Sequence, residues 1–126
     1  MSFTDLLAFK KSFSLSMKIF EISKTFPKEE KYSLTDQIRR SSRSDSANIS
    51  EAYRKRLYPK HFISKLSDSD AENSETLTWL MFALKCNYID GEMYKSLSSE
   101  NLEVGKLINY MINNPSKFGV NKTANW

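Results

Sequence analysis

The feature that most limits the fold of this chain is the scarcity of residues at which it can turn. Its 126 residues include only three Gly and three Pro, so long segments must run without a break. Turn-forming residues gather in three short stretches, FPKEEKYS at 26–33, YPK at 58–60 and NYIDG at 87–91. Between them, apolar residues recur every three or four positions, which is the period of an α-helix.

Four helices joined by short connections predict an all-α fold, an antiparallel up-down-up-down four-helix bundle. We expect the second helix to start at Ser33, the third to carry Pro59 in its first turn, and the fourth to begin at Asp90. The bundle is assigned to residues 1–113. Because the remainder has no apolar period, residues 114–126 are predicted to form a flexible C-terminal tail.

Composition is typical of a folded protein from a reducing compartment. Hydrophobic residues make up 40% of the sequence, which is too many for a disordered chain and enough for one core. The single cysteine, Cys86, cannot form an internal disulfide, and we expect it to pack near the end of the third helix. No stretch approaches the roughly 20 apolar residues that cross a bilayer, and the N-terminus does not resemble a signal peptide. We therefore expect a cytoplasmic protein without membrane contact.

The first helix is predicted to be apolar on two faces. One stripe contains Phe3, Leu6, Phe9, Phe13, Met17 and Phe20, and the other contains Leu15, Ile19, Ile22 and Phe26. Only one of these stripes can face the centre of the bundle. Because the other would be left exposed, it predicts a contact with a neighbouring subunit.

Polar residues occupy positions of the second and third helices that should point into the bundle. They are Asp45, Asn48, Asp70 and Asn73. If the two helices form a hairpin, these side chains lie at similar heights and can meet. A buried carboxylate needs hydrogen-bond donors, and neighbouring Ser and Thr residues can supply them. We interpret the set as a structural polar layer, and a catalytic carboxylate pair of Asp45 and Asp70 is the alternative.

Other enzyme chemistry finds little support in the sequence. His61 is the only histidine, so the paired Glu-x-x-His ligands of a di-iron bundle cannot be assembled. Neither a zinc-binding Cys/His spacing nor a Gly-rich phosphate loop occurs. We therefore expect no metal, no cofactor and no enzymatic activity.

Basic residues form the best candidate for a functional site. The segment QIRRSSRSDSANISEAYRKR at 37–56 combines Arg with Ser, as flexible RNA-coating tails do. Its apolar and small residues nevertheless share one helical face, and its arginines lie on the opposite face. Arginines at a fixed spacing can bind the phosphates of RNA or DNA. The candidate nucleic-acid-binding residues are Arg39, Arg40, Arg43, Arg54, Lys55, Arg56 and Lys60.

The charge pattern leaves a second interpretation open. An acidic run from Asp68 to Glu75 follows the basic segment, and the net charge of the whole chain is only +4. The arginines could instead pair with Glu51 or with this run, within one chain or between subunits. The protein would then be a structural or protein-interaction scaffold. Aromatic residues are sparse among the basic ones, so base stacking is a weak expectation.

Several motifs resemble those of a known family. They are LTDQIRRSSRSDSANISEAYRKR, YPKHF, DSDAENSET and FALKCNYI, and the most specific is the Q-I-R-R…S-x-x-x-N-I-x-E block from Gln37 to Glu51. Over residues 14–112 the chain resembles a family of small four-helix bundles. That family includes proteins encoded in intervening sequences of bacterial large-subunit ribosomal RNA genes.

The resemblance implies a binding module rather than an enzyme. Family members form homo-oligomers, typically pentameric rings, and relatives in diversity-generating retroelements are basic accessory proteins that bind a reverse transcriptase and nucleic acid. A homopentamer with RNA, DNA or a reverse transcriptase as partner is therefore implied. Asp45 stands where the family commonly has an apolar residue. We therefore expect Asp45 to need a hydrogen-bond donor that its relatives do not need.

Overall fold

The computed structural model describes residues 1–121, and within them the chain forms helices and no strands. The four long helices are α1 (Leu7–Ser23), α2 (Leu34–Arg54), α3 (Pro59–Lys85) and α4 (Gly91–Asn113). Three short 3-10 helices accompany them, η1 (Phe3–Asp5), η2 (Lys28–Glu30) and η3 (Pro115–Phe118). The prediction of an all-α chain with four main helices is confirmed. None of the helices in this part of the chain is both long enough and apolar enough to cross a membrane.

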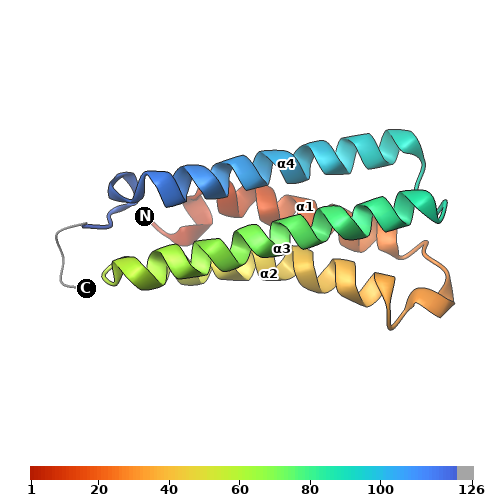
Figure 1. The fold of residues 1–126 in the computed structure, drawn as a ribbon, viewed down its shortest axis with the longest axis horizontal. Helices are drawn as coiled ribbons and strands as arrows, with labels where there is room; N and C mark the ends of the chain where they lie inside the picture. The colour runs from red at the N-terminus through yellow and green to blue at the C-terminus, as the bar shows by residue number, and fades with distance from the viewer. Residues whose placement is uncertain (122–126) are drawn as a thin grey trace.

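The four helices lie alongside one another on a common long axis (Figure 1). The α1–α2 and α3–α4 connections lie at one end of this axis, and the N-terminus, the α2–α3 turn and η3 lie at the other end. α1 and α3 each pack against both α2 and α4. α2 and α4 are therefore diagonal to each other, and α2 presents its outer face between α1 and α3.

The core contains apolar side chains from all four helices. Its largest fully buried members include Ile19 of α1, Ile38 and Ile49 of α2, Phe62, Leu66 and Leu80 of α3, and Ile108 of α4. Burial of each such side chain contributes about 1.5–3 kcal/mol. The inward positions of α2 recur at the helical spacing that the sequence predicts. The bundle therefore fixes which face of α2 remains outside.

α1 divides its two apolar stripes between the core and the surface. Leu15 and Ile19 are buried, whereas Phe13 and Met17 are 52% and 46% exposed. Part of the stripe that contains Phe13 and Met17 therefore remains on the surface of the single chain, as the two-faced pattern of this helix predicts.

The start of α2 is capped by a residue from the preceding 3-10 helix. Ser33 stands at the N-cap position, but its side chain accepts no hydrogen bond from the helix. Its hydroxyl instead donates to Oε1 of Glu30 over 2.6 Å, and the same oxygen accepts the amide of Leu34 over 3.2 Å. The hydroxyl of Tyr88 donates to the other oxygen over 2.8 Å. Hydrogen bonds from Ser33, Tyr88 and Leu34, in that order, lower the pKa of Glu30.

The segment that follows α4 differs from the prediction. The sequence predicts a flexible tail from residue 114, but Pro115 is buried in η3 and Val120 is only 2% exposed within the core cluster. Gly119 has a φ of +85°, which lets the chain fold back after η3. A single turn is too short to show a helical spacing of apolar residues, so the sequence pattern could not reveal that this segment packs against the bundle. Residues 122–126 of the predicted tail lie outside the described residues.

Candidate functional site

The basic residues of the predicted binding site lie along α2 and in the turn that follows it. Arg40, Arg43, Arg54, Lys55 and Lys60 are exposed, and Arg39 and Arg56 are half-buried. They form two groups. The first contains Arg39, Arg40 and Arg43, and the second contains Arg54, Lys55, Arg56 and Lys60. Arg43 and Arg54 are about 16 Å apart along the axis of α2, at a rise of about 1.5 Å per residue.

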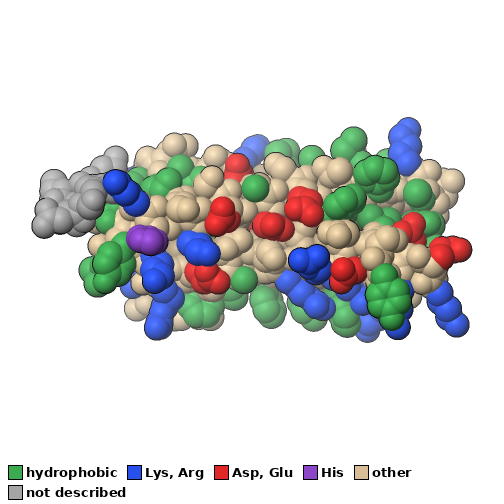
Figure 2. All heavy atoms as spheres, turned by 60° about the horizontal axis from the view of Figure 1, so that its bottom comes forward, with side chains coloured by type: hydrophobic (Ala, Val, Ile, Leu, Met, Phe, Trp, Pro, Cys, Tyr) green, Lys and Arg blue, Asp and Glu red, His purple; other side chains and the backbone are tan. Residues whose placement is uncertain are grey.

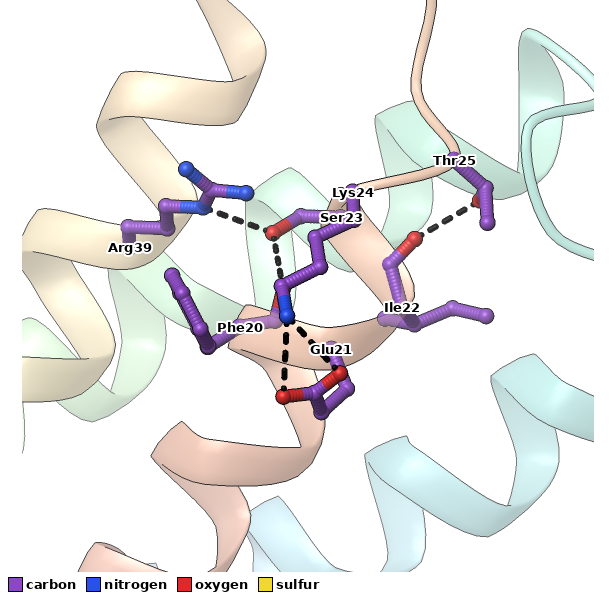
Figure 3. A network of polar contacts seen from close by, with 7 residues as sticks. All are labelled: Phe20, Glu21, Ile22, Ser23, Lys24, Thr25 and Arg39. Atoms are coloured by element: carbon purple, nitrogen blue, oxygen red, sulfur yellow. Dashed lines mark hydrogen bonds and ion pairs between the residues drawn. The ribbon is translucent and has the colours of Figure 1, made fainter.

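Arg39 is held against α1. Its Nε donates to Oγ of Ser23 over 2.8 Å, and its guanidinium lies 4.8 Å from the ring centroid of Phe20 (Figure 3). Ser23 in turn donates to the carbonyl of Phe20 over 3.0 Å. Arg43 lies above the same ring, with its guanidinium 5.4 Å from the centroid. One aromatic side chain of α1 therefore orients two arginines that are one turn apart on α2.

Arg56 is also engaged within the chain. Its Nε donates to the carbonyl of Tyr53 over 2.8 Å, and its guanidinium lies 3.7 Å from the centroid of the Tyr53 ring. These contacts join the α2–α3 turn, where Arg56 lies, to the last turn of α2, where Tyr53 lies. Arg56 therefore contributes to the fold, whereas Arg54 and Lys55 beside it face water.

Intramolecular ion pairs do not neutralise the arginines of α2. Ion pairs within the bundle join Lys11 with Glu103, Lys18 with Glu100, Lys24 with Glu21, and Lys65 with Glu51, and none of these pairs includes an arginine. Glu51, which the sequence offered as a partner for arginine, thus pairs with a lysine of α3 over 3.0 Å. Figure 2 shows Asp and Glu side chains gathered along the middle of one face, with Lys and Arg side chains beside them.

Arg40 acts electrostatically on one carboxyl group of this acidic row. Its charge acts to lower the pKa of Glu72, although burial of Glu72 and the nearby Glu75 raise that pKa by more. The pKa of Glu72 is therefore raised overall, and the charge of Arg40 is not the main influence on this carboxyl group. The positive face of α2 and the acidic face of α3 therefore adjoin each other without closing into direct ion pairs.

Asp45 lies at the centre of a buried polar network. Its side chain is buried, and Oδ1 accepts a hydrogen bond from Ser69. Ser69 also contacts the backbone carbonyl of Asp45 over 2.9 Å, and Nδ2 of Asn73 donates to Oδ2 over 3.3 Å. Burial raises the pKa of Asp45 to about 7, although the hydrogen bonds from Ser69 and Asn73 act in the opposite direction. The donor that Asp45 was expected to need is thus supplied by α3.

Asn101 extends this network to α4 and was not among the predicted residues. Nδ2 of Asn73 donates to the carbonyl of Asn101 over 2.9 Å and to its Oδ1 over 3.1 Å, and Nδ2 of Asn101 donates back to the carbonyl of Asn73 over 3.0 Å. Leu97 and Val104 lie four positions before and three positions after Asn101, and both are buried. That spacing was the available signal that Asn101 points inward.

Two of the predicted layer residues lie elsewhere. Asp70 is half-buried and accepts a hydrogen bond from Nδ2 of Asn109 over 2.9 Å, and Asn48 is also half-buried. Ser69 takes the inward position next to Asp70, because one residue turns the helix by about 100°. The polar layer therefore consists of Asp45, Ser69, Asn73 and Asn101. Asp70 lies outside it, and its charge is the weakest of the influences that raise the pKa of Asp45.

The structure also bears on the other residues that could carry chemistry. Cys86 is exposed at the end of α3 rather than packed. Residues 1–121 contain no group of three or more His, Cys, Asp or Glu side chains placed to hold a metal ion. Every buried side-chain nitrogen or oxygen in this range has a hydrogen-bond partner. Hydroxyl pairs complete the buried polar contacts, with Ser41 bonded to Thr76 over 2.8 Å and Ser12 bonded to Ser46 over 2.8 Å.

Comparison with known proteins places this geometry in a family. The model of the 23S rRNA-intervening sequence protein family matches residues 4–110 of the chain. The chain belongs to this family. The resemblance seen in the motifs is thereby confirmed, and the matched range includes α1, α2, α3 and most of α4.

A solved relative of this 23S rRNA-intervening sequence family protein has the same fold. The chain is similar to a crystal structure of a protein with unknown function from the S23 ribosomal protein family of Bacteroides thetaiotaomicron VPI-5482. The two are 31% identical with a TM-score of 0.77, and the match covers 85% of this chain and 96% of the other. A search of curated proteins found no match.

In this family member, Gly105 provides the space that the polar layer needs. A Cβ atom at Gly105 would lie 2.8 Å from Oδ1 of Asn73, whose side chain is fixed by hydrogen bonds to Asp45 and Asn101. Alanine normally stabilises a helix by about 1 kcal/mol relative to glycine. We nevertheless expect Gly105→Ala to lower the free energy of unfolding by about 1–3 kcal/mol, measured by urea denaturation.

Gly91 is the matched control for this prediction. It begins α4, and a Cβ atom there would meet nothing within 4 Å. Gly91→Ala should therefore leave the stability unchanged or raise it slightly. If Gly105→Ala were as stable as Gly91→Ala, the polar layer would not depend on the missing side chain.

Proposed function

We propose that this 23S rRNA-intervening sequence family protein is a non-enzymatic, oligomeric protein that binds the phosphates of RNA, or of DNA, through the arginines of α2. The observation that carries the proposal is the set of exposed arginines Arg40, Arg43 and Arg54. They fall within about 60° of one another around the helix axis and form no ion pair with the described carboxylates. Such guanidinium groups are free to bind phosphates in bidentate fashion.

The proposal is tested by changing these three arginines to glutamine. We expect the variant Arg40→Gln/Arg43→Gln/Arg54→Gln to bind single-stranded RNA more weakly and with a smaller salt dependence. The slope of log affinity against log salt concentration should fall by about 0.7 for each lost phosphate contact, hence by about 2. Fluorescence anisotropy of a labelled RNA, titrated at several KCl concentrations, measures this slope, and DNA of the same sequence gives the comparison.

A matched control removes the same charge from other helices. Lys10, Lys95 and Lys106 are exposed on α1 and α4, so Lys10→Gln/Lys95→Gln/Lys106→Gln lowers the net charge equally. The control should keep the salt slope of the wild type. Wild-type binding that is independent of salt, or equal loss in both triple variants, would refute the assignment of phosphate contacts to α2.

We further propose that the protein assembles as a homo-oligomer of antiparallel bundles, a pentamer as the family resemblance implies. An apolar groove between α1 and α4 supports self-association. Phe13, Met17 and Met93 line this groove, whose volume is about 750 Å³, and each is at least one-third exposed. Exposed apolar surface of this kind is typical of an interface. The retroelement resemblance adds a reverse transcriptase as a proposed protein partner.

A scaffold role is the second candidate, and the adjoining charged faces of α2 and α3 favour it (Figure 2). In that role the arginines of one subunit would pair with the acidic row of the next. The same arginine variant distinguishes the two functions in a sizing experiment. Dissociation to monomers supports the scaffold, whereas an intact oligomer that has lost RNA affinity supports nucleic-acid binding.

A further inference from the structure

An aromatic pocket lies where η2 and the start of α2 meet the end of α3. Its volume is about 340 Å³, which is near the lower limit for small-ligand sites. Trp79 and Phe82 line it, with ring centroids 5.8 Å apart and planes tilted by 37°. Tyr32 also lines it and is 84% exposed, and Phe82 is 52% exposed. Tyr32 and Phe82 therefore offer aromatic surface that the core does not use, beside Trp79, which also packs against the core.

Gln37 is one of the residues that line this pocket, and its amide has no hydrogen-bond partner among the described residues. Its side chain is half-buried. The carboxylate of Glu30, which also lines the pocket, is by contrast occupied by Ser33, Leu34 and Tyr88. The unused polar group is thus an amide, which provides both a hydrogen-bond donor and an acceptor.

Two basic residues lie next to residues that line the pocket, in the sequence or on the surface of α2. Nζ of Lys31 is 5.3 Å from the ring centroid of Tyr32. Arg40 follows Gln37 by three positions on α2, so the two side chains are neighbours on the helix surface. A ligand in the pocket would therefore place a flat apolar part against the rings and an anionic part towards Lys31 and Arg40.

These features together match a nucleobase on a phosphate backbone. A base stacks on aromatic rings, and its edge carries the donors and acceptors that an amide can bind. We propose that the pocket captures one unstacked base of single-stranded RNA on Trp79 and Phe82, with Gln37 at the base edge and Arg40 on the adjoining phosphate. This inference rests on the proposed function, and it adds a preference for unpaired RNA because a paired base cannot enter the pocket.

The aromatic wall is tested with the variant Tyr32→Ala/Phe82→Ala. Both side chains are at least half exposed, so the variant is expected to fold, and circular dichroism checks this. A labelled oligouridylate should bind about tenfold more weakly to the variant than to the wild type, whereas a blunt-ended RNA duplex should bind equally to both proteins. Met81 is 51% exposed on α3 and is not among the residues that line the pocket, so Met81→Ala is the matched control.

Cys86 provides a second readout, because it is the only cysteine of the chain and lines the pocket. Bound oligouridylate should slow the reaction of the Cys86 thiol with a maleimide. An abasic oligonucleotide of the same length keeps the phosphates but has no base to insert. It should therefore leave the reaction rate unchanged, even at concentrations at which it binds.

The outcomes separate this inference from the proposed function. If the wild type bound no RNA, both would be overturned. If it bound oligouridylate and the RNA duplex equally, with no effect of Tyr32→Ala/Phe82→Ala and no protection of Cys86, only the base pocket would be overturned. Single-strand preference that is lost in the variant, together with base-dependent protection of Cys86, supports the pocket.

Discussion

Replacing Asp45 with valine is expected to raise the free energy of unfolding at pH 8 by about 2–4 kcal/mol. Burial raises the pKa of this carboxyl to about 7, so at pH 8 the wild type must hold an ionised group in its core. The substitution leaves no donor unsatisfied. Ser69 still has the backbone carbonyl of residue 45, and Asn73 still has Asn101.

The protonated form of Asp45 completes the same network. Its Oδ1–H can donate to Ser69, whose own hydroxyl hydrogen then goes to the backbone carbonyl of Asp45, while Oδ2 accepts from Asn73. In the ionised form the single hydrogen of Ser69 must serve two acceptors. The hydrogen-bond geometry and the burial of Asp45 thus both favour its protonated form.

The pH dependence of stability follows from this difference. The unfolded chain releases the proton near the ordinary value of 3.8, whereas the folded chain holds it until about pH 7. Between these values the folded state binds more protons, so the free energy of unfolding of the wild type falls as pH rises and then levels off. At low pH, where the carboxyl is protonated in both states, Asp45→Val should lose most of its advantage.

Urea denaturation at a series of pH values measures this effect. Asp45→Val and Asp45→Asn should both lack the decline that the wild type shows. Asp70→Asn is the control, because it removes a nearby carboxylate from the half-buried surface and should keep the decline. An Asp45→Val variant that melts many degrees below the wild type at pH 8 would contradict the prediction.

Deleting residues 114–126 is expected to lower the free energy of unfolding by about 3 kcal/mol. The deletion removes Val120 from the core cluster, the buried Pro115, and the ring of Phe118, which packs edge-on against Tyr110 with centroids 6.0 Å apart. The apolar side chains beneath them would become exposed to water. Urea denaturation of the shortened and full chains gives the difference directly.

Point substitutions show whether this loss comes from packing. Val120→Ala should cost about 1–2 kcal/mol, whereas Ser116→Ala, at an exposed position of the same turn, should change little. A shortened chain that unfolds at the same urea concentration as the full chain would mean that η3 and Val120 contribute nothing to the core.

The sequence by itself determined that the chain forms four main helices and that it belongs to this family. Sparse Gly and Pro, apolar residues at helical spacing, and end signals such as Pro59 and Asp90 specified where the main helices begin. The pattern of α2 also predicted which side carries its arginines. These features depend on residues within one or two turns of each other, so local pattern is enough to reveal them.

Only the tertiary structure decided which side chains meet. It placed Ser69 rather than Asp70 beside Asp45, brought Asn101 into the polar layer, packed Val120 into the core, and joined Tyr32 to Trp79 around one pocket. Each of these contacts depends on the rotation of a helix about its axis and on its register against its neighbours. The packing of the whole core sets both quantities at once, and residues adjacent in sequence do not encode them.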